Sequence, residues 1–290
     1  MNATNLITEV YYAYRGKGAT RVPVWGSEKQ QTALAIANRK TVEWATDSDQ
    51  IWASNFAATA PNEAGTVATA GTTALTGTDT YFTDYNVGDQ ITVSGETVRT
   101  IDTIVSDTSL TVTVAFANTA SAKTFTRTTI IASAVQAYSL NRKLIAPASE
   151  VLVTTSTQDV PLQYTKPQSK NDGDVYISGR NPRLVTFYND IESTSQLVGG
   201  TLKIAGYYLP DELVNQTDLV SVDDPNWLVY ATAAELARND PAKDSEFGNL
   251  MGMANDLFRK MIAANRNLGY LSGSTIPYNM PPMGGVSDEW

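Results

Sequence analysis

The 290-residue chain contains no histidine and no cysteine. It therefore cannot form a Ser-His-Asp or Cys-His nucleophile, a zinc site with histidine or cysteine ligands, a disulfide or a thiolate-bound iron–sulfur cluster. Carboxylate, lysine and tyrosine chemistry remains possible, so enzymatic activity is disfavoured rather than excluded. We expect a protein that is not an enzyme, with no catalytic residues, no metal site and no cofactor.

Basic residues are also scarce: 21 Lys and Arg stand against 30 Asp and Glu, which gives a formal net charge of −9. Nucleic-acid binding draws much of its affinity from neutralising phosphates, which an acidic chain does poorly. The densest basic cluster is only Arg15, Lys17 and Arg21. We therefore expect no specific binding of nucleic acid.

Long apolar runs and targeting signals are missing as well. No apolar run approaches the roughly 18 residues of a membrane span, and the start of the chain, residues 1–5, has no basic region typical of a signal peptide. The sequence therefore predicts no membrane association, and a protein that is made and kept in a cytosol-like compartment or leaves it by a route other than secretion.

Residues 1–62 are predicted to be mainly helical. Ser27 and Gln30 match the S-x-x-Q capping box, and apolar residues then recur at three- and four-residue spacing, which predicts a helix over 28–46. A shorter apolar segment, 5–14, has partial helical spacing and is expected to stop at Gly16-Lys17-Gly18.

Residues 66–128 differ sharply in composition, because threonine occupies 19 of these positions. Alternating apolar and polar residues predict strands at 90–94, 99–104 and 109–114, separated by turn residues. The short, evenly spaced strands indicate a small antiparallel barrel inserted over residues 63–128.

The remaining chain is predicted to form strands and then a helix pair. Strands are expected at 136–144, 150–155, 174–178, 183–188 and 201–208, and Asn171-Asp172-Gly173 is read as an Asx-type turn of a hairpin. Asp224-Pro225 and Asp240-Pro241 each place an N-cap and a first-turn proline before an apolar stripe. They predict antiparallel helices over 226–238 and 242–265. The expected fold class is α+β: a helical bundle, a β-rich lobe and the inserted barrel.

Acidic clusters offer the remaining candidate chemistry. Asp47-Ser48-Asp49 begins like a calcium loop, but the glycine and glutamate that such a loop needs at its sixth and twelfth positions are Trp52 and Ala58. We interpret it as a polar helix end. Asp211-Glu212 and Asp223-Asp224 are interpreted as a solvated loop and a helix cap rather than as an acid–base pair.

The C-terminal segment 269–290 is rich in glycine, proline and aromatic residues and has no periodicity that could bury it in its own fold. A long apolar terminus is typically disordered or bound to a partner, and the aromatic content favours binding. The candidate anchors are apolar side chains: Tyr270, Tyr278, Met280, Met283 and Trp290.

Two sets of segments resemble known phage proteins. One set resembles head-to-tail adaptor (neck or connector) proteins of tailed bacteriophages and comprises residues 28–52, 203–210, 227–237 and 255–265. The other resembles the small SH3-like barrels of phage neck and tail proteins and comprises residues 87–91 and 106–111. The barrel insertion departs from a minimal adaptor.

The resemblance implies a structural virion protein that forms a homo-oligomeric ring, commonly of twelve copies (a dodecamer), beneath the portal. Residues 1–62 and 129–268 would form the adaptor body, and the tail would bind the portal protein. The ring would also contact a downstream neck or tail-tube protein, and genomic DNA would pass through it without specific binding. The protein would be located in the virion neck, and in the host cytoplasm during assembly.

Two alternatives remain open. One is another virion component, such as a tail-tube, capsid-decorating or fibre-attachment protein. The other is a carbohydrate-binding or carbohydrate-cleaving surface protein, suggested by the threonine-rich module together with 14 Tyr and 5 Trp. Against the second, Trp25, Trp44 and Trp52 lie in or beside the predicted N-terminal helices and not on strands.

Overall fold

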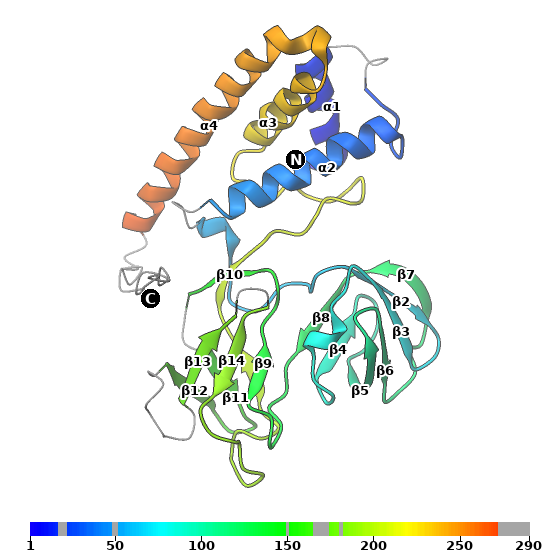
Figure 1. Ribbon diagram of the computed structural model, residues 1–290, viewed down its shortest axis with the longest axis vertical. Coiled ribbons are helices and arrows are strands. Elements are labelled where there is room, and N and C mark those ends of the chain that lie inside the picture. Colours follow the sequence, from blue (N-terminus) through cyan, green and yellow to red (C-terminus); the bar gives the residue numbers. More distant parts are fainter. Residues whose placement is uncertain (17–21, 48–51, 149–150, 165–173, 180–181, 272–290) are drawn as a thin grey trace, which may run out of the picture. The chain divides into compact units, whose positions relative to one another are not determined.

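The computed structural model describes residues 1–16, 22–47, 52–148, 151–164, 174–179 and 182–271. It divides into two compact units. Met1–Ser54 and Glu212–Trp290 form the helical unit, and Asn55–Asp211 forms the β-rich unit (Figure 1). The predicted α+β class is therefore confirmed, with four α-helices among the described residues and a sheet-rich body.

The helical unit is built from both ends of the chain. Its helices are α1 (Ala3–Arg15), α2 (Glu28–Ala45), α3 (Pro225–Arg238) and α4 (Asp244–Leu271). Helix α3 packs against each of the other three, which explains why Leu228, Ala233 and Ala234 are fully buried. Two short 3₁₀ helices follow α2 and α3 in the chain, η2 (Ala53–Asn55) and η4 (Pro241–Lys243).

The helix starts follow the predicted capping residues. Ser27 Oγ accepts a hydrogen bond from Gln30 N, while Gln30 Oε1 accepts one from Gly26 N, a residue earlier than in a standard capping box. Asp224 caps α3 by accepting from Asn226 N at 2.9 Å. At the other end of α1, Gly16 has a φ of 78° and its N–H bonds Tyr12 O, so it stops the helix as expected.

The start of α3 lies beside the late part of α4, because the N–H of Asp224 lies 3.3 Å from Met261 Sδ. The connection differs from the prediction in one detail. Asp240 is followed by the 3₁₀ turn η4, and α4 begins only at Asp244. Helix α4 also continues to Leu271, so it includes the first three residues of the segment expected to be an extended tail.

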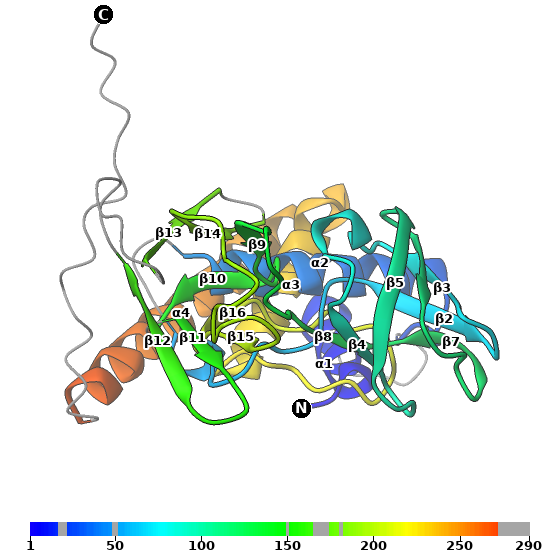
Figure 2. The same ribbon diagram turned by 90° about the horizontal axis from the view of Figure 1, so that it is seen from below.

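The N-terminal half of the β-rich unit is a seven-stranded sheet in the order β7-β2-β3-β6-β5-β4-β8. Its strands are β2 (Thr66–Ala70), β3 (Ala74–Thr78), β4 (Gln90–Val93), β5 (Arg99–Ser106), β6 (Ser109–Val112), β7 (Thr119–Lys123) and β8 (Phe125–Thr128). The short helix η3 (Phe82–Asp84) lies between β3 and β4. Only Thr124 separates the two edge strands β7 and β8, so the sheet curls (Figures 1 and 2).

The second half contains a six-stranded sheet in the order β15-β11-β12-β13-β14-β9. Its strands are β9 (Ala137–Ser139), β11 (Val151–Thr154), β12 (Asp159–Tyr164), β13 (Asp174–Ser178), β14 (Leu184–Phe187) and β15 (Thr201–Lys203). Strands β12 and β13 pair in parallel, with Gln163 opposite Asp174. The hairpin predicted around 171–173 is therefore wrong for this pair, since a hairpin joins antiparallel strands; residues 171–173 themselves lie outside the described residues.

A three-stranded sheet, β1-β16-β10, completes the unit with β1 (Phe56–Ala57), β10 (Leu144–Pro147) and β16 (Gly206–Tyr208). The segments 136–144 and 201–208 were each predicted as one strand, but each divides between two sheets. Each large sheet also has its own apolar core. Phe82, Phe125 and Leu75 lie inside the curled sheet, whereas Tyr138 and Val153 belong to the core of the six-stranded sheet.

Candidate functional site

The anchors predicted in the C-terminal segment are only partly described. Tyr270 lies in the last turns of α4, where the backbone is described. Tyr278, Met280, Met283 and Trp290 lie outside the described residues. The structure therefore brings none of these five residues together, and their role stays a prediction.

The acidic candidates have structural partners. Asp211 bonds Lys143 Nζ at 2.5 Å and Asn62 Nδ2 at 3.2 Å, and Asp224 is the cap of α3. In the calcium-like segment only Asp47 is described. Across the described parts of the chain, no group of three or more carboxylates is placed to hold a metal ion.

A group of buried charged side chains surrounds Arg127 of β8. Alternate residues of a strand share a face, so Arg127 points to the same side as the buried Phe125. Its side chain is only 3% exposed. Because an arginine cannot lose its charge in a protein, the fold must supply anionic and neutral acceptors for it.

The Nε and both Nη atoms of Arg127 have polar partners. Its Nε lies 3.4 Å from Glu63 Oε1, and its Nη1 lies 3.8 Å from Asp89 Oδ2. Nη1 and Nη2 donate to Oγ and the backbone O of Ser139 at 2.8 and 2.7 Å. The guanidinium carbon lies 4.3 Å from the centre of the Tyr85 ring, within range of a cation–π interaction.

The two carboxylates around Arg127 are as buried as the cation, with 5% of Glu63 and none of Asp89 exposed. Asp89 also accepts backbone hydrogen bonds from Ile130 at 2.9 Å and Asn86 at 3.1 Å. When both carboxylates are ionised, one guanidinium faces two negative charges. The extra negative charge makes the stability of these buried side chains depend on whether the carboxylates are protonated.

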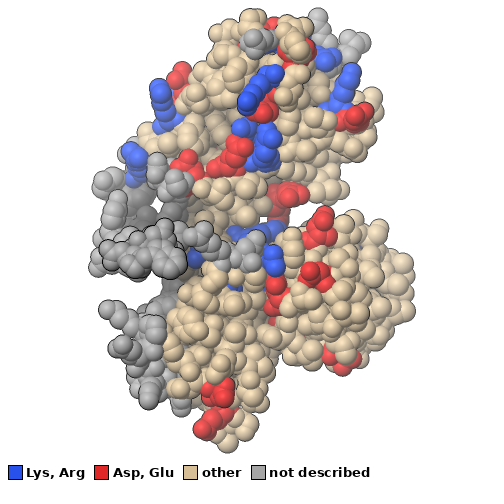
Figure 3. All heavy atoms as spheres, in the orientation of Figure 1, with Lys and Arg blue, Asp and Glu red and all other residues tan. Residues whose placement is uncertain are grey.

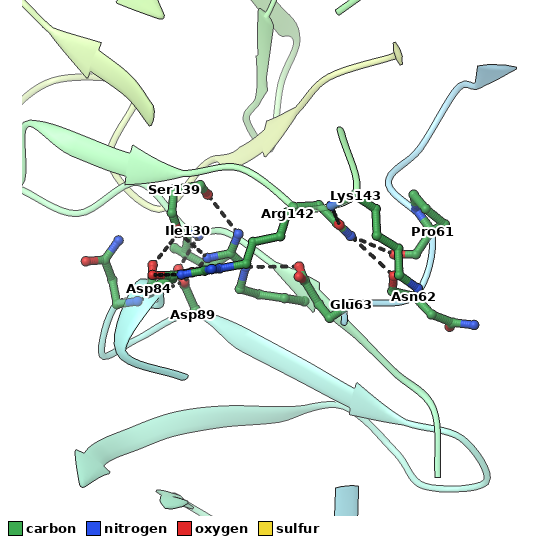
Figure 4. A network of polar contacts seen from close by, with 12 residues as sticks. Pro61, Asn62, Glu63, Asp84, Asp89, Ile130, Ser139, Arg142 and Lys143 are labelled. Atoms are coloured by element: carbon green, nitrogen blue, oxygen red, sulfur yellow. Dashed lines mark hydrogen bonds and ion pairs between the residues drawn. The ribbon is translucent and has the colours of Figure 1, made fainter. Parts of the chain in front are cut away.

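A second ion pair lies beside the first (Figure 4). Arg142 holds Asp84 through two hydrogen bonds, Nε to Oδ2 at 2.5 Å and Nη2 to Oδ1 at 3.2 Å, and stacks 3.7 Å from the Tyr81 ring centre. Ser139 connects the pairs, because its Oγ accepts from Arg127 and donates to the backbone O of Asp84. We call Glu63, Asp84, Asp89, Arg127, Ser139 and Arg142 the ionic cluster.

The ionic cluster joins the two large sheets of the β-rich unit. Asp84, Asp89 and Arg127 come from η3, the loop before β4, and β8 of the curled sheet. Ser139 is the last residue of β9 in the six-stranded sheet, and Arg142 follows it. Buried charge-assisted hydrogen bonds have strict geometry, so this connection fixes the orientation of one sheet against the other.

Burial dominates the electrostatics of the ionic cluster. Desolvation raises the pKa of Glu63 and of Asp89 above the usual carboxyl range, and the attraction of Arg127 opposes this only in part. Burial, together with the charge of Glu63, also raises the pKa of Tyr85. Raised carboxyl pKa values occur at catalytic sites, but they occur in structural ion networks too. The complete burial of Asp89 and its engagement with Arg127 favour the structural role.

The raised pKa of Glu63 predicts a measurable pH dependence. The folded protein binds this proton more tightly than the unfolded chain, so stability falls as the pH rises from about 4.3, the unfolded value, through the folded pKa. Glu63→Gln removes this loss. We expect the unfolding free energy of the variant, minus that of the wild type, to increase with pH over this window, as measured by urea denaturation at a series of pH values.

Glu96→Gln is the matched control. Glu96 is partly exposed, and backbone N–H donors of Ala117 and Asn118 together with the Asn118 side chain lower its pKa. Its contribution has the opposite sign, because stability is lost as the pH falls through the folded pKa. A Glu63→Gln difference that stays flat with pH, or that follows the Glu96→Gln slope, would contradict the assignment.

Sequence reasoning missed the ionic cluster, although one signal was present. The spacing of Phe125 and Arg127 places the arginine on the buried face of a strand, where it needs an anion. Glu63 and Asp89 gave no such signal: Glu63 precedes the threonine-rich segment, and Asp89 reads as a turn residue after Gly88. Their partners are distant in the sequence and become visible only in the fold.

The helical unit contains a second cluster, which is aromatic. Trp44 of α2 stacks on Trp52 with ring centres 5.1 Å apart, and Trp52 Nε1 donates to Trp44 O at 2.7 Å. Phe258 of α4 contacts both Trp52 and Trp227 of α3, at 5.8 and 5.7 Å. Aromatic packing thus connects three helices from the two ends of the chain.

The distribution of charged side chains on the surface differs between the helices and the curled sheet. Figure 3 shows acidic and basic side chains side by side over the helices, whereas the face over β2–β7 in this view is mainly uncharged with a few acidic groups. Thr103 of β5 and Thr111 of β6 in this sheet have their hydroxyls 2.6 Å apart. None of the described helices is both long enough and apolar enough to cross a membrane.

No protein-family model matches the chain, and no curated protein matches it either.

Proposed function

We propose that the protein is a structural virion component: a head-to-tail adaptor whose copies form a ring beneath the portal of a tailed bacteriophage. The observation that carries the proposal is the nested architecture. Both chain ends form the helical unit, and the β-rich unit is inserted between Ser54 and Glu212. This organisation agrees with the adaptor layout that the sequence segments resemble, a helical body combined with a β-rich lobe.

We further propose that residues 63–128 form an SH3-like barrel. The curled sheet supports this, because its edge strands β7 and β8 are consecutive in the chain and separated only by Thr124. Lys123 pairs with Val67 of β2, while Phe125 pairs with Val93 of β4. One bent segment thus reaches both ends of the sheet, which is how a small sheet removes its exposed edges.

The ionic cluster supports a mechanical role for the barrel. A module that contacts a neighbouring subunit must keep its orientation under load, and buried charge-assisted hydrogen bonds provide that stiffness. In this proposal the cluster orients the barrel and has no catalytic task. The protein acts through shape and interface area and is not an enzyme.

The net charge suits a channel for DNA. Each copy carries a formal charge of −9, and a ring multiplies it. Acidic walls repel phosphate and let DNA pass without specific binding. A closed ring also requires heterologous contacts, in which one face of a subunit complements a different face of the next.

Native mass spectrometry of the purified full chain tests this function. We expect a closed assembly of twelve copies, or one that forms when the portal protein is added. Six or three copies would instead favour a tail-tube or fibre-attachment component. A chain that remains a monomer beside the portal and binds or cleaves glycans would contradict both virion roles.

A further inference from the structure

A shallow groove lies on the helical unit above its aromatic cluster. Its lining includes Trp44, Trp227 and Phe258 from three different helices, and Met251 and Asn255 of α4. Lys40 and Glu43 of α2, which pair across 2.7 Å, also line it. The lining thus combines aromatic and apolar side chains with a charged pair, which is typical of a site for an apolar segment.

One of the residues that line this groove, Trp44, has a polar atom without a partner. Trp44 is 1% exposed, and its Nε1 is buried with no hydrogen-bond acceptor among the described residues. Most buried indole N–H groups are paired, since an unpaired one costs about 1–3 kcal/mol.

The chain holds a segment of matching chemistry. Residues 272–290 follow α4 directly and contain Met280-Pro281-Pro282-Met283. There is no charged side chain between Leu271 and Asp288, so burying this part desolvates no charge. Pro281 and Pro282 have no N–H to leave unpaired, their carbonyls remain acceptors, and methionine adapts to irregular apolar surfaces.

The lengths agree as well. Phe258 and Met251 precede the end of α4 at Leu271 by 13 and 20 residues, which is about 20–30 Å at the ~1.5 Å rise of a helix. An extended chain covers ~3.3 Å per residue, so a segment returning along α4 reaches about 30–40 Å at residues 280–283. The same chain can therefore deliver these residues to its own groove.

We propose that the groove between α2, α3 and α4 holds residues 280–283 of the same chain, with the two prolines against the aromatic side chains that line it. Docking of this kind uses an extended proline segment on an aromatic surface, at a low entropic cost. The docking is independent of the proposed ring. Where that function holds, a portal that binds Met280 and Met283 must first displace them from the groove. The groove and the portal then compete for the same residues.

Disulfide crosslinking of the full chain tests the docking, and the absence of native cysteine makes the result unambiguous. Asn255→Cys combined with Gly284→Cys places one thiol at the groove and one beside the docked segment. The control pair is Asn249→Cys with Gly284→Cys, which moves the first thiol to another exposed asparagine of α4 that does not line the groove. We expect the Asn255 pair to crosslink within monomers at least tenfold faster than the control.

A further substitution, Met283→Asp, is expected to slow the Asn255 pair to the control rate, because a charge would enter an apolar groove. Equal rates for the two pairs would overturn the proposal, as would a product that links two chains, since the occupant would then be a second copy. Ring formation is measured in a separate experiment. A negative crosslinking result therefore rejects the docking and does not bear on the proposed function.

Discussion

Arg127→Met is expected to lower the unfolding free energy of the β-rich unit by about 3–5 kcal/mol at neutral pH. The substitution leaves Glu63 and Asp89 buried without their cation and removes two hydrogen bonds to Ser139. The loss should be smaller near pH 4, because both carboxyl groups can then be neutral. Urea denaturation followed by far-UV circular dichroism measures the change.

The distribution of tryptophan makes this experiment specific to one unit. The tryptophans that the structure describes, Trp25, Trp44, Trp52 and Trp227, all belong to the helical unit. Their fluorescence should therefore show little change in Arg127→Met, while the β-sheet signal shifts. Lys123→Met, at an exposed lysine of β7 in the same sheet, is the control and should change stability by about 0.5 kcal/mol or less. An Arg127→Met variant as stable as that control would contradict the role of the ionic cluster.

Trp52→Ala is expected to have a similar effect on the helical unit, about 3–5 kcal/mol. Trp52 is 1% exposed, stacks on Trp44, contacts Phe258 and donates a hydrogen bond to Trp44 O. Its removal leaves a cavity between helices from the two ends of the chain. The fluorescence of the remaining tryptophans should report an earlier unfolding transition in urea.

Trp52→Phe separates packing from hydrogen bonding. It retains an aromatic ring but loses the bond to Trp44 O, so its cost should be well below that of Trp52→Ala. Hydrogen exchange of β4, β8 and β9 should stay at the wild-type level in both variants. Equal stability of Trp52→Ala and the wild type, or an effect confined to those strands, would show that the aromatic cluster does not hold the helices together.

The features that sequence reasoning predicted correctly are encoded locally. Asp224-Pro225 and Ser27 with Gln30 mark helix starts because a cap needs only a few neighbouring residues. The strands β4 and β6 were also found, since Ile91, Val93, Leu110 and Val112 alternate with polar residues over one buried face.

The features that sequence reasoning missed have weak local patterns or depend on pairing with distant strands. Strands β2 and β7 consist mostly of threonine and alanine, and Val67 is the only large apolar side chain in the two strands, so the alternation is weak. No local residue pattern indicates the parallel pairing of β12 with β13, because its register depends on strands elsewhere in the sheet. The division of 201–208 between two sheets is likewise set by the partners, Leu202 beside Val153 and Tyr207 beside Phe56.

The candidate sites show the same limit. A buried arginine was predictable from strand alternation, but which carboxylates meet it was not, because Glu63, Asp89 and Arg127 are separated by tens of residues. The aromatic groove likewise needs Trp44 and Trp227, which come from opposite ends of the sequence. A site assembled from distant segments requires the fold before its chemistry can be read.

Negative-stain imaging of the purified full chain, alone and with its portal protein, tests the central claim most directly. The account predicts closed rings around a central opening, with twelve copies in register and no substrate turnover. Particles that remain single subunits under both conditions, or an isolated subunit that converts a substrate, would contradict it.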